Sequence, residues 1–141
     1  MRPVRLARGV ITVAGAVGLT LAAAQTFRPS DYSGQELFAR YCASCHGPDA
    51  QGDGPVAPSL RKYVPDLTRI TVRHGNRFPA QEVRDMIDGR SPVLSHGPRE
   101  MPVWGREFWV EEGADIEAER AARDMVTELV SYLESIQVDA R

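Results

Sequence analysis

The chain of 141 residues has two cysteines, which lie three positions apart and are followed directly by a histidine. These residues are Cys42, Cys45 and His46, in the segment YCASCH. This spacing is typical of c-type haem attachment, because two sulfurs separated in this way can each form a thioether bond to one edge of a porphyrin. His46 would then lie beneath the iron and supply one axial nitrogen. The segment therefore predicts one covalently bound haem c, with its iron, at the centre of the fold.

Three other uses of a cysteine pair fit this segment less well. A structural zinc site needs four Cys or His ligands, usually with a second close pair, and here His74 and His96 are isolated. A redox dithiol of the thioredoxin kind normally follows a β-strand, whereas a helical pattern precedes Cys42. A disulfide between Cys42 and Cys45 would close a loop too small to add much stability. The pair is therefore interpreted as two haem attachment points.

The second axial ligand of such an iron has to come from elsewhere in the chain. Met101 lies in the loop-like segment SHGPREMPVWG, and Pro102 fixes the backbone just after it. A methionine ligand favours electron transfer, whereas an open iron site suits gas or peroxide chemistry. Met86 and Met125 fall on the apolar faces of predicted helices, where core packing is the better interpretation. Met101 is therefore the predicted distal ligand, with His96 as its main competitor.

The first 24 residues have the features of a secretory signal peptide. Three arginines precede position 9, no acidic residue precedes Asp31, and residues 10–24 are uncharged and end in small side chains. This pattern predicts cleavage after Ala24 and export to the periplasm, which leaves residues 25–141 as one cytochrome c domain. An uncleaved membrane anchor is the alternative, although an apolar stretch of this length is shorter than the roughly 20 residues that span a bilayer.

The charge of the expected mature chain argues against a nucleic-acid partner. Residues 25–141 carry 14 basic and 19 acidic residues, a formal charge of −5. Phosphate binding needs clustered Lys and Arg, which this balance does not favour.

Hydrophobic spacing predicts an all-α domain of three to four helices. A helix over 33–43 would begin at a capping box formed by Ser33 and Glu36. A second is expected over 79–89, with Pro79 in its first turn and Gly89 at its end. The last and clearest is expected over 115–137, where apolar residues recur every three or four positions.

Two long irregular segments are expected between these helices. Residues 47–65 are rich in proline and glycine, and residues 90–114 combine glycine, proline and aromatic residues. Residues 66–76 fit either a strand or a short helix. A long ordered loop in a small domain usually encloses something, and haem needs protein on both faces.

These features resemble the small class I c-type cytochromes, the single-haem electron carriers of bacteria. The resemblance rests on GQELFARYCASCH, GPVAPSL, MPVWG and LVSYLESI, and extends over nearly all of residues 25–141. It implies a cytochrome c fold wrapped around one haem, with Gly34 and Phe38 packed against Tyr132 or Leu133 of the last helix. It also implies that the Pro58 carbonyl (or, as an alternative, that of Pro55) accepts the His46 N–H.

The resemblance implies further haem contacts and a function. Leu60 is expected to pack on the ring, and Arg99, Arg106 and Trp104 are candidates to bind the propionates. The implied function is electron transfer between periplasmic redox proteins, not catalysis. One alternative is an electron-transfer subunit of a periplasmic or membrane oxidoreductase, in which the acidic segment 108–119 docks a basic partner. The other is a ligand-binding haem protein, which applies if Met101 does not bind the iron. In either alternative, we expect the protein to contact the membrane only through a partner protein or through an uncleaved N-terminal segment.

Overall fold

The computed structural model of the protein describes residues 28–90 and 101–138, and all of the regular elements in these residues are helical. The α-helices are α1 (Gly34–Leu37), α2 (Ala43–His46), α3 (Ile70–Arg73), α4 (Ala80–Asp88), α5 (Trp104–Glu111) and α6 (Ile116–Ser135). Shorter elements are the 3₁₀ turns η1 (Pro29–Asp31), η3 (Ala57–Ser59) and η4 (Leu67–Arg69) and the π-turn η2 (Phe38–Cys42). The all-α prediction is confirmed. Within the described residues, no helix is both long and apolar enough to cross a membrane.

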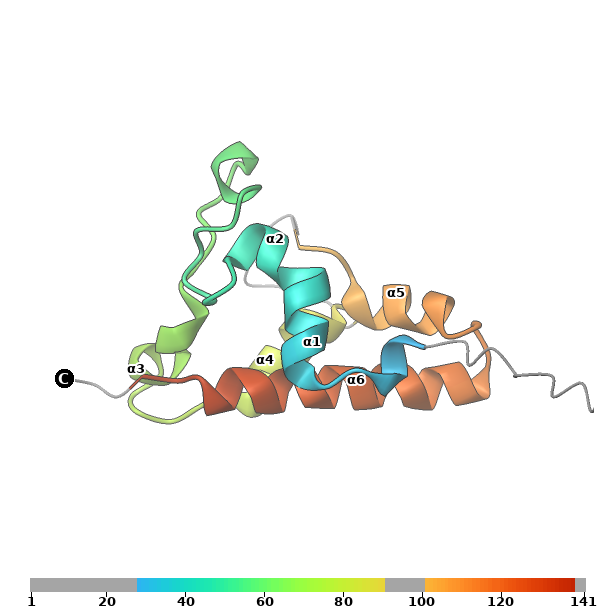
Figure 1. Ribbon diagram of the computed structural model, residues 1–141. Coiled ribbons are helices and arrows are strands. Elements are labelled where there is room, and N and C mark those ends of the chain that lie inside the picture. Colours follow the sequence, from blue (N-terminus) through green and yellow to red (C-terminus); the bar gives the residue numbers. More distant parts are fainter. Residues whose placement is uncertain (1–27, 91–100, 139–141) are drawn as a thin grey trace, which may run out of the picture.

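Helix α6 is the longest element, and α1, α4 and α5 all pack against it (Figure 1). It begins where the Asp115 carboxylate accepts a hydrogen bond from the Ala118 N–H at 2.8 Å, which satisfies one of the free amides of the first turn. Its buried stripe consists of Ala118, Ala122, Met125, Val126, Leu129, Val130 and Leu133. The helix therefore lies close to its predicted bounds, and Met125 belongs to the core as expected.

The crossing of α1 over α6 depends on Gly34. A Cβ atom at this position would overlap the Glu128 carbonyl oxygen and come within 2.9 Å of the Tyr132 Cβ. Only a glycine allows the two backbones to approach this closely. One turn later, Phe38 contacts Tyr132 with ring centroids 5.4 Å apart. The predicted contact between Gly34, Phe38 and the last helix is thus present, and Tyr132 is the residue that makes it.

Helix α4 matches the helix predicted over 79–89. Pro79 precedes it as the N-cap, one position before the expected one. At the other end, Gly89 adopts a left-handed conformation with φ of 68°, and its N–H bonds to the Asp85 carbonyl at 3.0 Å. This is the usual glycine termination of a helix.

The prediction of an irregular segment over 90–114 was wrong for its second half, because α5 occupies Trp104–Glu111. Trp104 and Phe108 lie four residues apart on one face of this helix, and Phe108 is fully buried. Their rings stack with centroids 5.6 Å apart. Aromatic packing of this kind stabilises a short helix whose own propensity is weak.

The segment between α2 and α4 is mostly irregular, as predicted for residues 47–65. Residues 66–76, which fitted either a strand or a helix, form η4 and α3. The Asp66 carboxylate caps this turn by accepting the Thr68 N–H at 2.9 Å. Gln137, just past α6, holds the turn in place: its side chain donates to the Leu67 carbonyl at 2.8 Å and accepts from the Thr71 N–H at 2.9 Å.

Candidate functional site

The cysteine motif lies at the end of one continuous helical stretch formed by α1, η2 and α2. Within η2 the helix widens by one residue, and the Ala43 N–H donates to the Phe38 carbonyl five residues back. Such π-turns are uncommon and often lie at functional sites. The stretch ends at His46, and Gly47 turns the chain away with φ of 78°.

The loop that follows the motif folds back onto the helix end. The Gly52 N–H bonds to the His46 carbonyl at 2.8 Å, the Gly54 N–H to the Cys45 carbonyl at 3.2 Å and the Val56 N–H to the Ser44 carbonyl at 2.9 Å. These bonds satisfy carbonyls that a helix end leaves without partners. A Cβ atom on Gly54 would come within 2.5 Å of the Ser44 carbonyl oxygen, so this close approach requires glycine. The loop is thereby fixed to the helix end that carries His46.

His46 is partly buried, and its Nδ1 has no hydrogen-bond partner within the described residues. Burial lowers the pKa of its imidazole, and the nearby Pro65 carbonyl acts in the opposite direction without forming a well-aligned bond to Nδ1. The ring is therefore neutral near pH 7, the form that binds metals. A neutral imidazole at a helix end beside two thiols is therefore available as a metal ligand.

The two cysteines are not bonded to each other. Cys42 is buried, and this burial, together with the negative charge of a Cys45 thiolate, raises the pKa of its thiol to about 12. Cys45 is more accessible and lies one turn further along, beside His46. The motif therefore presents two reduced sulfurs and a neutral imidazole at one helix end, a donor set that fits covalent haem.

Met101 is half-buried and packs against the hydrophobic core. Three residues later, Trp104 contacts Tyr41 edge to face, with ring centroids 5.5 Å apart. Tyr41 immediately precedes Cys42, so this contact brings the segment after Met101 against the helix that carries the motif. Trp104 is thus a packed indole, and its predicted propionate contact stays a prediction.

Two glutamates at the end of α5 have structural partners that the sequence did not indicate. The Tyr41 hydroxyl donates to the Glu111 carboxylate at 2.7 Å, and the Ser30 N–H donates to the Glu112 carboxylate at 2.8 Å. Burial and this carboxylate raise the pKa of Tyr41 to about 12. The acidic segment 108–119 therefore includes part of α5 and ties it to the start of the domain, which weakens its interpretation as a docking surface.

The remaining predicted haem neighbours have no contact with His46 that would establish their roles within the described residues. Pro58 is exposed in η3, and Leu60 is half-buried outside the main hydrophobic core. The carbonyl that acts on His46 is that of Pro65, so the roles of Pro58 and Leu60 stay predictions. Arg99 and His96 lie outside the described residues.

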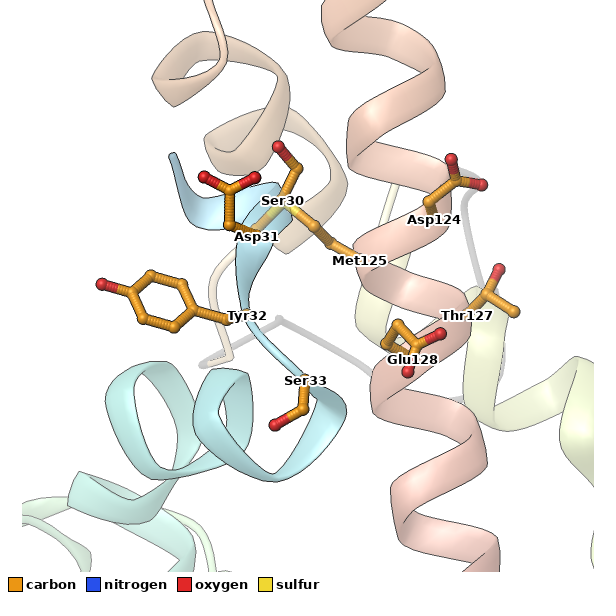
Figure 2. Close-up of a pocket in the computed structure, with 8 residues that line it drawn as sticks. All are labelled: Ser30, Asp31, Tyr32, Ser33, Asp124, Met125, Thr127 and Glu128. Carbon is orange, nitrogen blue, oxygen red and sulfur yellow. The ribbon is translucent and has the colours of Figure 1, made fainter. Parts of the chain in front are cut away.

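Two further side chains and one pocket lie away from the motif. Arg106 is exposed on α5, and His74 is exposed with its Nδ1 2.9 Å from the Ile70 carbonyl. The pocket lies between α6 and the segment that contains η1 and the residues just after it (Figure 2). It is lined by Ser30, Asp31, Tyr32, Ser33, Asp124, Met125, Thr127 and Glu128. None of the predicted haem residues lines it.

Comparison with known proteins identifies the family. A family model described as cytochrome c oxidase, cbb3-type, subunit III matches residues 30–118, a range that contains the cysteine motif and Met101. No curated protein and no solved structure matches the chain. This family model describes a c-type cytochrome domain, whose haem is covalently bound and transfers electrons through its iron. The chain therefore belongs to this family and is a class I c-type cytochrome, with the all-α cytochrome c fold, haem c and a role in haem-based electron transfer.

Proposed function

We propose that this protein is an exported single-haem electron carrier, in which Cys42 and Cys45 hold the haem while His46 and Met101 are the axial ligands of its iron. The observation that carries the proposal is the partly buried, neutral His46 ring at the end of the helix that carries both thiols. When bound, the haem supplies one-electron chemistry without a substrate.

The chain's own residues have three roles in this proposal. The thiols attach the cofactor, so that it is not lost by dilution in the periplasm. His46 offers a neutral nitrogen, and the loop from Gly47 to Val56 restricts its movement through backbone hydrogen bonds. Met101 offers a thioether, a ligand that raises the reduction potential. The contact between Trp104 and Tyr41 supports this role, because it brings the methionine segment to the helix of the motif.

The ligand assignment is tested with a matched pair of methionine variants. Met101→Leu is expected to abolish the far-red band that marks methionine bound to ferric haem, and to let the ferrous protein bind CO. Met125→Leu makes the same chemical change in the core of α6 and is expected to leave the band intact. A band that survives Met101→Leu would show that another methionine is the ligand. Wild-type protein that lacks the band and binds CO readily would favour a ligand-binding haem protein.

Export and haem attachment are tested by the mass of the denatured protein. We propose residues 1–24 as a cleaved signal peptide and residues 25–141 as the cytochrome domain. The intact mass of the protein purified from detergent-solubilised cells is expected to equal that of residues 25–141 plus one haem. A mass that retains residues 1–24 would indicate a membrane anchor, and loss of haem on denaturation would contradict thioether attachment.

A second candidate function is that of an electron-transfer subunit in an oxidoreductase complex. It is favoured by the description of the matching family, which names a subunit of cytochrome c oxidase. Gel filtration of a mild detergent extract separates the two candidates. A free carrier elutes as a particle of its own mass, whereas a subunit elutes with a larger assembly that retains oxidoreductase activity.

A further inference from the structure

We propose that Arg90 is a positioning residue that holds the first turn of α5, and through it Met101, in the place required for binding the iron. This inference rests on the proposed function in that it takes Met101 as the distal ligand. The structure contains a specific link between Arg90 and the turn that follows Met101.

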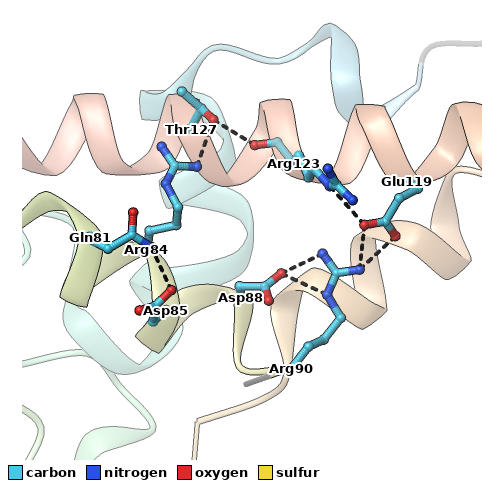
Figure 3. Close-up of polar contacts among 8 residues, drawn as sticks. All are labelled: Gln81, Arg84, Asp85, Asp88, Arg90, Glu119, Arg123 and Thr127. Carbon is cyan, nitrogen blue, oxygen red and sulfur yellow. Dashed lines mark hydrogen bonds and ion pairs between the residues drawn. The ribbon is translucent and has the colours of Figure 1, made fainter. Parts of the chain in front are cut away.

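Arg90 joins two helices through its guanidinium group (Figure 3). Its Nε and Nη2 lie 2.9 and 2.7 Å from Oδ1 of Asp88, at the end of α4. Its Nη1 lies 2.7 and 3.0 Å from the two carboxylate oxygens of Glu119, in the first turn of α6. Glu119 is further held by Arg123 at 3.0 Å. Because planar guanidinium groups make several directed bonds at once, this arrangement fixes a geometry that a single point charge would not.

Helix α5 rests directly against this ion pair at Gly105. A Cβ atom at Gly105 would overlap Oδ1 of Asp88 and come within 2.9 Å of the Arg90 Nε. The first turn of α5 therefore lies close against both members of the pair, and a larger residue at this position would have to displace their side chains. The ends of α4, α5 and α6 meet at this point.

The same turn of α5 determines where Met101 lies. The Val103 carbonyl, at the start of the helix, accepts hydrogen bonds from the backbone N–H groups of Arg106 at 2.9 Å and Glu107 at 3.1 Å. Pro102 restricts the backbone between Met101 and this turn. A shift of the Gly105 turn away from α4 would therefore move Met101 as well.

Other contacts hold α4 to α6 without Arg90, so its loss is not expected to unfold the protein. Arg84 donates to the Thr127 hydroxyl at 2.9 Å in the middle of both helices. Ile87 is buried in the shared core. The contribution of Arg90 is local to the first turns of α5 and α6.

The experiment measures imidazole binding to the oxidised holoprotein, since imidazole competes with methionine for the iron. In Arg90→Gln the fraction of molecules with a displaced methionine is expected to rise, and the apparent Kd for imidazole to fall about tenfold. The matched control is Arg120→Gln, which removes an exposed arginine paired with Glu117 at 2.7 Å within α6 alone. Its Kd is expected to stay within about twofold of the wild type, because exposed pairs contribute little.

Gly105→Ala tests the same link from the other side. It displaces the Asp88–Arg90 pair while leaving all charges in place, and we expect imidazole binding to tighten in this variant too. Equal Kd values for Arg90→Gln and Arg120→Gln, or no change in Gly105→Ala, would overturn the proposal. Failure of the ligand assignment is distinguishable, because the far-red band would then be absent from the wild type or kept in Met101→Leu, whatever Arg90 does.

Discussion

The contact between Gly34 and α6 gives a sharp prediction for Gly34→Ala. A methyl group at this position overlaps the Glu128 carbonyl oxygen and lies 2.7 Å from its carbonyl carbon. Both atoms belong to the backbone of α6, so no side-chain rotation relieves the overlap. Helix α1 has to move outward, and Phe38 then loses part of its contact with Tyr132.

The expected magnitude follows from three effects. Overpacking of a well-ordered contact costs about 1–3 kcal/mol, and the rigid backbone partners place this case near 3 kcal/mol. A weakened aromatic pair adds about 0.5–1 kcal/mol. The exchange of glycine for alanine in a helix stabilises by about 1 kcal/mol at most, because it lowers the entropy of the unfolded chain. The variant should therefore be less stable by about 2.5–3.5 kcal/mol.

The assay is urea unfolding of the holoprotein followed by circular dichroism. We expect a lower midpoint with an unchanged slope, since the surface exposed on unfolding stays the same. Gln35→Ala, at the neighbouring exposed position of α1, is the control and should change stability by less than about 0.5 kcal/mol. A Gly34→Ala variant as stable as the wild type, or more stable, would refute the close approach of the two backbones.

Two other predictions concern hydrogen bonds outside the haem motif. Gln137→Ala leaves the Leu67 carbonyl and the Thr71 N–H without their partner, so we expect a loss of about 1–3 kcal/mol in the free energy of unfolding. Gln137→Glu keeps the acceptor for Thr71 but loses the donor to Leu67, so this variant should lose less. Equal stability of the wild type and both variants would contradict this role. The pKa of Tyr41 is raised to about 12 from 10.0, so its neutral form is favoured in the folded state, and the resulting stabilisation is present below pH 10 and lost as the pH rises toward 12. Titration of the phenolate absorbance should therefore show a late step that disappears in Tyr41→Phe and moves to lower pH in Glu111→Gln, and an unchanged curve in both variants would rule out the hydrogen bond.

The parts of the fold that the sequence predicted are those with a strong local pattern. Helix α6 has apolar residues at every third or fourth position together with an N-terminal cap, and α4 ends at a glycine that adopts a left-handed conformation. Covalent haem follows from the spacing within the cysteine motif, because attachment chemistry restricts which residues can be used. These features are local, so no knowledge of the tertiary structure was needed.

Helix α5 was not predicted from the sequence, because its stability comes from tertiary contacts. Gly105 lowers its intrinsic helix propensity, yet the same residue is required for the contact with Asp88 and Arg90. The four-residue spacing of Trp104 and Phe108 was the available signal, but Pro102 and the nearby glycines suggested a loop. Contacts between distant residues, such as Tyr41 with Glu111, have no signature in the sequence.

The π-turn between Phe38 and Cys42 sets the rotational phase between the two ends of the first helical stretch. Each residue of an α-helix advances the side-chain direction by about 100°, and the widened turn takes up one extra residue. Relative to Gly34 and Phe38, the cysteine motif is therefore rotated by roughly that angle from the place where a regular α-helix of the same sequence would put it. The stretch can therefore present one side to α6 and a different side to the cofactor. A regular α-helix of the same sequence would keep every residue of both motifs, and yet direct the thiols and the imidazole to a different part of the domain.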